Sequence, residues 1–170
     1  MNYFELFGIT PSFILVEEEL RQKYYEKSRE YHPDRFGLLP QEEQIHALEM
    51  STTINKAYRT LSSKRERIKY VLEINGIDFV EGSEKVPQEF LIEVMDINEM
   101  IMEFKMDPEN DLKDDILKQL KRVDDELNEG IQSLFEEFNF QNKDEKQLLL
   151  IKDYYLKTKY IDRIVSNLDN

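Results

Sequence analysis

The stretch Tyr31-His32-Pro33-Asp34-Arg35-Phe36 decides how the first half of the chain folds. Proline has a fixed φ and no backbone N–H, and Pro33 also pushes the preceding residue out of helical geometry. A helix that reaches this stretch must therefore end there and be followed by a loop. The same bend places an imidazole, His32, close to a carboxylate, Asp34. The two side chains could act together at neutral pH, because histidine titrates there and a carboxylate can accept a bidentate bond from a partner arginine.

Helical patterns flank this bend on both sides. Three glutamates, residues 17–19, open a helix predicted over residues 16–31, because acidic side chains stabilise the positive end of the helix dipole. Apolar residues at three- and four-residue steps predict a second long helix over residues 41–61. These apolar residues are Ile45, Leu48, Ile54, Ala57, Tyr58 and Leu61. A short helix is expected before these two helices and another after them. The first ends at Gly8, and the last, which is basic, ends at Asn75-Gly76.

The second half of the chain reads as a separate domain. Residues 77–87 contain Gly82, Ser83 and Pro87 and show no periodicity, so they predict a linker between a domain at 1–76 and one at 88–170. Three amphipathic helices follow, over about 88–105, 108–138 and 142–168. Short connections between long helices predict an antiparallel three-helix bundle. The expected fold class is therefore all-α.

Composition excludes several functions. The chain has 170 residues, no cysteine and two histidines, so thiolate metal sites and thiol chemistry are excluded, and no metal or cofactor is expected. The formal net charge of −13 is a poor match for nucleic-acid phosphates. It favours a basic protein partner or, for most of these residues, simply a solvated surface. No run of roughly 20 apolar residues is present, and residues 1–7 do not read as a signal peptide. We therefore expect no membrane association and a cytoplasmic location.

His32-Pro33-Asp34 between two long helices resembles the J domain, and the resemblance covers residues 1–75. In that family this loop and the preceding helix contact a DnaK-class chaperone and stimulate its ATPase. The resemblance implies five chaperone-binding residues, His32, Pro33, Asp34, Arg21 and Arg35. Three residues depart from the general pattern: Glu26 and Glu30 replace basic residues, and Lys27 replaces a core leucine. These departures favour a specialised chaperone partner.

Further motifs narrow the resemblance. The opening Asn2-Tyr3-Phe4-Glu5-Leu6-Phe7-Gly8 and the run Ile54-Asn55-Lys56-Ala57-Tyr58-Arg59-Thr60-Leu61 are followed by a helical bundle instead of a Gly/Phe-rich or cysteine-rich region. The whole arrangement resembles the HscB family of J-type co-chaperones of iron–sulfur cluster assembly. The resemblance implies a non-enzymatic protein that delivers an IscU-type scaffold to a DnaK/HscA-class chaperone. A J-domain co-chaperone with a different client is the alternative. An enzyme using His32 and Asp34 is disfavoured, because no nucleophile or third polar group converges with them.

The first bundle helix is apolar on two sides. Phe90, Val94, Ile97, Ile101 and Phe104 form the stripe that a bundle core needs. Leu91, Ile92, Met95 and Met102 form a second stripe, which either packs against another part of the chain or meets a partner. The HscB resemblance favours the partner and implies these scaffold-binding residues: Leu91, Ile92, Met95, Asp96, Glu99, Glu103 and Tyr160. Their acidic rim implies a basic patch on the scaffold.

Overall fold

A computed structural model describes residues 1–80 and 84–168 of the chain. Within these ranges all regular elements are helices, which confirms the predicted all-α class. The chain divides into two compact units, Met1–Gly76 with Phe140–Asn142, and Ile77–Asn139 with Lys143–Asn170. Part of the predicted linker, residues 81–83, and the last two residues of the predicted bundle, 169–170, lie outside the described residues.

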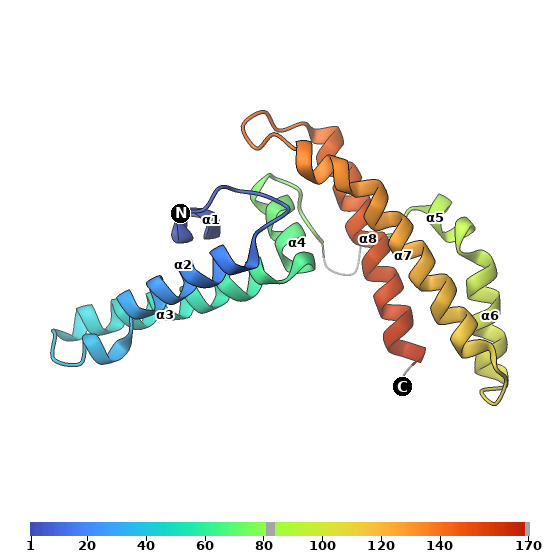
Figure 1. Ribbon diagram of the computed structural model, residues 1–170, viewed down its shortest axis with the longest axis horizontal. Coiled ribbons are helices and arrows are strands. Elements are labelled where there is room, and N and C mark those ends of the chain that lie inside the picture. Colours follow the sequence, from blue (N-terminus) through green and yellow to red (C-terminus); the bar gives the residue numbers. More distant parts are fainter. Residues whose placement is uncertain (81–83, 169–170) are drawn as a thin grey trace. The chain divides into compact units, whose positions relative to one another are not determined.

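The first unit is built around an antiparallel helical hairpin. Helices α2 (Glu17–Glu30) and α3 (Gln41–Ser62) run side by side, and a one-turn 3₁₀ helix, η1 (Pro33–Arg35), lies in the loop between them (Figure 1). The short helices α1 (Tyr3–Phe7) and α4 (Lys64–Ile74) complete the unit. Its largest fully buried side chains are Phe4, Phe7, Phe13, Ile54, Leu61, Leu72 and Val71. This core lies at the end of the hairpin away from η1.

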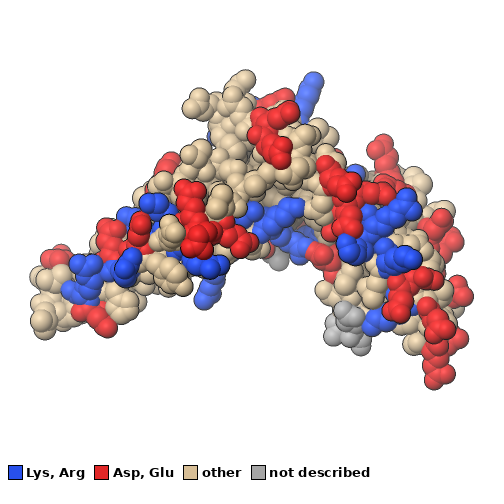
Figure 2. All heavy atoms as spheres, in the orientation of Figure 1, with Lys and Arg blue, Asp and Glu red and all other residues tan. Residues whose placement is uncertain are grey.

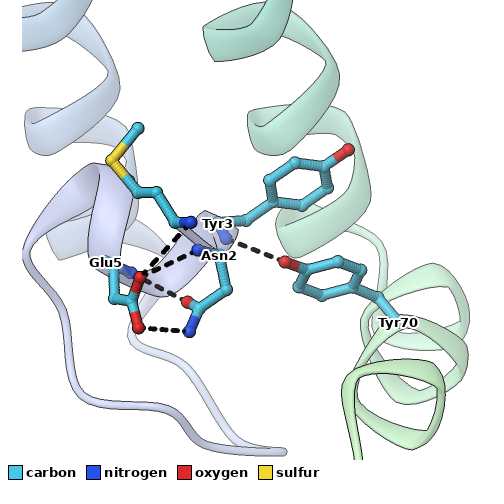
Figure 3. Close-up of polar contacts among 5 residues, drawn as sticks. Asn2, Tyr3, Glu5 and Tyr70 are labelled. Atoms are coloured by element: carbon cyan, nitrogen blue, oxygen red, sulfur yellow. Dashed lines mark hydrogen bonds and ion pairs between the residues drawn. The ribbon is translucent and has the colours of Figure 1, made fainter.

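The N-terminal helix is held by a compact set of polar contacts (Figure 3). The Asn2 side chain accepts from the Glu5 backbone N–H at 3.0 Å, and the Glu5 carboxylate accepts from the Asn2 backbone N–H at 2.9 Å, which forms a capping box. Tyr70 of α4 accepts from the Tyr3 N–H at 2.8 Å, and the two rings stack with centroids 4.3 Å apart. Orphan N–H groups of the first turn are thus satisfied, and α1 is fixed against α4.

The predicted apolar face of α3 is buried only over its second half. Ile54, Ala57 and Leu61 are fully buried, whereas Ile45 and Leu48 are exposed. Helix α2 buries only Leu20, near its start, so it offers no fully buried apolar side chain near the tip of the hairpin. The apolar pattern of α3 therefore predicted the helix correctly, but in its first half the buried residue is Ala47 instead of Ile45 or Leu48.

The second unit is the predicted bundle, with its first helix broken. Helices α5 (Gln88–Glu93) and α6 (Met95–Met106) take the place of the single helix expected over 88–105, and they pack with α7 (Leu112–Glu137) and α8 (Glu145–Leu168) (Figure 1). Helix α7 also begins later than expected, because residues 107–111 form a turn. The core combines residues of all four helices: Phe90, Val94, Ile97, Ile101, Ile116, Leu120, Ile161 and Leu168.

The break between α5 and α6 falls at Val94, where φ is −97° and ψ is 15°. Neither proline nor glycine is present, and the Val94 side chain is fully buried. Backbone bonds continue across the break, from Val94 N–H to the Phe90 carbonyl at 3.1 Å and from Asn98 N–H to the Val94 carbonyl at 3.0 Å. The bend therefore arises from packing of α5 and α6 on their neighbours, which local sequence does not encode.

Candidate functional site

The loop between α2 and α3 presents His32 and Asp34 on the one-turn helix η1. His32 is the N-cap of η1, and its Nδ1 accepts from the Asp34 backbone N–H at 3.3 Å. The same Nδ1 lies 3.7 Å from the Asp34 carboxylate, so the imidazole and the carboxylate are held close together. Pro33 occupies the first position of the turn, where its missing N–H costs nothing. The His32 and Asp34 side chains are 56% and 90% exposed, so both can reach a partner.

The two predicted arginines lie in different surroundings. Arg35 Nη1 donates to the Arg29 carbonyl at 3.1 Å, which satisfies an orphan carbonyl in the last turn of α2 and anchors η1 to that helix. Arg21 is exposed on α2 and forms an ion pair with Glu18 at 3.6 Å. Arg21 and the end of α2 at Glu30 are about 14 Å apart along the helix axis. The structure therefore groups His32, Pro33, Asp34 and Arg35, and leaves Arg21 apart from them.

Acidic residues partly neutralise the basic side chains of α2. Lys23 Nζ lies 3.3 Å from the Glu26 carboxylate, and Lys27 Nζ lies 2.8 Å from the Glu30 carboxylate. The hydrogen bond with Glu30 raises the pKa of Lys27 above its ordinary value. Glu26, Lys27 and Glu30 are the three residues that depart from the general J-domain pattern, so the departures change the charge of this helix face.

A second exposed surface lies on α5 and α6. Leu91 and Ile92 of α5 are 39% and 64% exposed, and Met95 of α6 is 51% exposed. We call these three residues, together with the exposed carboxylates of Asp96, Glu99 and Glu103, the α5–α6 surface. In Figure 2 acidic side chains crowd the edge of this unit along α6 and the following turn. An apolar strip bordered by carboxylates suits a partner with an apolar patch and basic surroundings.

Tyr160 of α8 packs against residues of α5 and α6 next to the α5–α6 surface. Its hydroxyl donates to Asn98 Oδ1 of α6 at 2.9 Å, and its ring meets the ring of Phe90 edge-on at 6.0 Å. The side chain is half-buried, and the Arg163 guanidinium lies 5.5 Å from its centroid. Tyr160 thus contacts both helices on either side of the break, and differs from the exposed residues with which the sequence grouped it.

Sequence reasoning missed part of the exposed apolar surface. On α6, Met106 extends the strip formed by Met95 and Met102, and the helical spacing 95, 102, 106 was the available signal. At the tip of the hairpin, four large apolar side chains are exposed close to η1 in the sequence: Leu38, Leu39, Ile45 and Leu48. The paired leucines in a loop were the signal there.

The described residues contain no group of three or more His, Cys, Asp or Glu side chains placed to hold a metal ion. A search for membrane spans over the same part of the chain finds no helix long and apolar enough to cross a bilayer.

Comparison with known families matches both halves of the chain. The family described as the DnaJ domain matches residues 2–70, and the family described as the HSCB C-terminal oligomerisation domain matches residues 86–169. Among curated proteins, the chain is 36% identical over 117 residues to the co-chaperone protein HscB of Proteus mirabilis, covering 67% of this chain and 68% of that one. It is 38% identical over 136 residues to an HscB homolog of Neisseria meningitidis serogroup B, covering 79% and 77%.

Two solved structures share the fold. Human co-chaperone protein HscB matches with a TM-score of 0.78 and 27% identity, over 99% of this chain and 81% of that one. Chaperone HscB from Vibrio cholerae matches with a TM-score of 0.73 and 24% identity, over 99% and 96%. At 24% identity, the match to the Vibrio cholerae structure shows a shared fold only.

Proposed function

Because the chain belongs to the HscB family of DnaJ-domain co-chaperones, we propose that it binds an IscU-type iron–sulfur scaffold and delivers it to a DnaK/HscA-class chaperone. The observation that carries this proposal is the presence of two exposed surfaces on separate units. One is the His32-Pro33-Asp34 turn, and the other is the α5–α6 surface. Each has the chemistry of a protein contact, and neither has that of a catalytic pocket.

The chaperone contact would be made by the turn. Asp34 offers an almost fully exposed carboxylate for a partner arginine, and His32 offers an exposed imidazole for a hydrogen bond. Arg35 holds the turn against the end of α2 through its bond to the Arg29 carbonyl. Arg21 would be a separate contact further along α2. The ATPase site belongs to the chaperone, so this chain acts by binding and has no catalytic residue of its own.

The scaffold contact would be made by the α5–α6 surface. Leu91, Ile92 and Met95 supply apolar area, and methionine adapts well to an irregular partner surface. The carboxylates of Asp96, Glu99 and Glu103 would face basic residues of the scaffold and speed its encounter. Tyr160 would hold this surface in place through Asn98 and Phe90.

The mechanism follows from joining the two contacts in one chain. A scaffold held by the second unit has a high effective concentration near the chaperone that the first unit engages. Stimulated ATP hydrolysis would then close the chaperone on the delivered scaffold and favour release of its cluster. The iron–sulfur cluster is cargo of the scaffold in this scheme.

Calorimetric titration with a purified IscU-type scaffold tests the proposal. We expect the double variant Leu91→Ala with Met95→Ala to bind at least about tenfold more weakly than the wild type, because two apolar anchors are truncated. The matched control, Ile45→Ala with Leu48→Ala, removes exposed apolar side chains of the first unit and should bind like the wild type. If the wild type binds no scaffold but still stimulates the chaperone, the client is another protein.

A further inference from the structure

Helices α7 and α8 extend beyond the helices that cover them. The 26 residues of α7 span about 39 Å, whereas the 6 of α5 and the 12 of α6 together span about 27 Å. Helices α6 and α7 are joined by a short turn, so the unmatched length lies at the opposite end, beyond Gln88. Over that length the described residues form no third helix in the groove between α7 and α8, whereas α5 and α6 fill it elsewhere in the bundle.

This groove contains an apolar hollow of about 280 Å³. Its apolar lining is formed by Leu127, Ile131, Leu134, Leu150 and Tyr154. Gly130, in the middle of α7, also lines it, and a Cβ built there would meet no atom within 4 Å. Apart from proline, glycine is the least favourable residue in a helix interior, and here its missing side chain leaves the groove open.

The hollow adjoins the α5–α6 surface. Lys157 lines the hollow, and its Nζ lies 5.4 Å from the centroid of the Phe90 ring of α5. Tyr160, one turn further along α8, packs edge-on against the same ring. Leu91, the first exposed residue of the α5–α6 surface, directly follows Phe90 in the chain. Lys157 and Phe90 therefore connect the lining of the groove to the start of α5, where a partner of the α5–α6 surface would lie.

The charges at the groove have the same dominant sign as those of the α5–α6 surface. Glu126, which also pairs with Arg122 at 2.9 Å, and Asp153 border the hollow. Lys157 is the one basic residue among those that line it, and its amine already lies over Phe90. A basic partner thus meets carboxylates at both places, whereas an acidic partner would be repelled at both.

We propose that the α7–α8 hollow is a second contact for the client that binds the α5–α6 surface, and that it receives an apolar side chain flanked by Lys or Arg. This inference rests on the proposed function, because it takes the same basic client as the occupant. The apolar side chain would lie over Gly130, and the neighbouring basic residue would face Asp153 and Glu126. A single apolar side chain buried in such a hollow is commonly worth about tenfold or more in affinity.

The variant Gly130→Leu tests the proposal, since it adds an apolar side chain to the lining of the hollow at a position where a Cβ meets no atom within 4 Å. Its matched control is Gln132→Leu, which places the same side chain at an exposed position two residues along α7, on the opposite side of the helix. Both variants are titrated with a purified IscU-type scaffold, and their thermal unfolding is recorded. We expect scaffold affinity to fall about tenfold in Gly130→Leu and to stay within twofold of the wild type in Gln132→Leu, with Tm not lowered in either.

An NMR measurement on the wild-type chain tests the same contact without relying on a variant that must fold correctly. The Gly130 amide should shift in ¹H–¹⁵N spectra when unlabelled scaffold is added. Equal affinities for Gly130→Leu and Gln132→Leu, or an unmoved Gly130 signal under saturating scaffold, would overturn the second contact and leave the proposed function intact. If the chain alone self-associates in sedimentation and Gly130→Leu abolishes that, the occupant is a second copy and the proposal is wrong. If the wild type binds no scaffold at all, the proposed function itself fails.

Discussion

Arg67 offers the sharpest test of how the first unit is held together. Its side chain is 9% exposed on α4, and its guanidinium donates to the Phe13 carbonyl at 3.0 Å and to the Leu61 carbonyl. It thereby joins α4 both to the segment before α2 and to the end of α3. Burial lowers the pKa of Arg67 from its ordinary value, so the fold retains this cation at the expense of its hydration.

The variant Arg67→Met keeps an apolar stem of similar length and removes both donors. Hydrogen bonds from a charged group contribute about 1.5–3 kcal/mol each, and relief of the buried charge returns part of that. We therefore expect a loss of about 3 kcal/mol in the free energy of unfolding. Arg67→Lys should recover little, because an ammonium group cannot serve the two carbonyls as a guanidinium fork does.

Urea unfolding combined with hydrogen exchange provides the assay, because exchange reports the first unit separately from the second. Arg59→Met is the control, since Arg59 is exposed on α3 and its loss should change stability by less than about 0.5 kcal/mol. Exchange of α4 amides should accelerate in Arg67→Met and not in the control. Equal stability losses in the two variants would refute the structural role of the Arg67 bonds.

Three further predictions concern single groups. Tyr160→Phe removes the donor to Asn98, so unfolding should be easier by about 1 kcal/mol and scaffold affinity about threefold lower, with chaperone stimulation in the absence of scaffold unchanged; calorimetry that gives the wild-type affinity would contradict this. Burial raises the pKa of Tyr70, so the stability that this side chain contributes is complete below pH about 10 and is lost as pH rises through the folded pKa. In urea unfolding at a series of alkaline pH values, Tyr70→Phe should show a smaller decrease of the free energy of unfolding with pH than the wild type, and an equal decrease would contradict this. Gly8→Ala should lower the free energy of unfolding by about 1 kcal/mol in urea, because Gly8 caps α1 with φ at 63°, a backbone conformation that is unfavourable for alanine. No neighbour would clash with the added Cβ, so an unchanged free energy of unfolding would show that alanine adopts this conformation without cost.

Much of the fold could be predicted because it is encoded locally. Pro33 ends the region of α2, three- and four-residue apolar steps mark α3 and α7, and Gly8 and Gly76 both have positive φ near helix ends. These features need only neighbouring residues to be recognised. The second apolar stripe of the first bundle helix also follows from helical phase, whereas the exposure of Leu91 and Met95 does not, because the same pattern fits packing within the chain.

The remainder depends on contacts between distant residues. Nothing near Val94 signals a break, because the bend is set by packing of α5 and α6 on other helices. Arg67 lies within a basic stretch that reads as solvent-exposed, yet two backbone carbonyls from other segments draw it into the core. The half-buried position of Tyr160 depends likewise on Asn98, 62 positions away. The individual site residues came from family resemblance, which identifies positions but not their burial.

The steady-state ATPase rate of an HscA-type chaperone, measured with this chain and with or without an IscU-type scaffold, tests the central claim most directly. We predict stimulation by the wild type and a further, more than additive increase when scaffold is present. His32→Gln should lose the stimulation, and Leu91→Ala with Met95→Ala should keep it while losing the increase from scaffold. No stimulation by the wild type, or stimulation that His32→Gln leaves intact, would contradict the account.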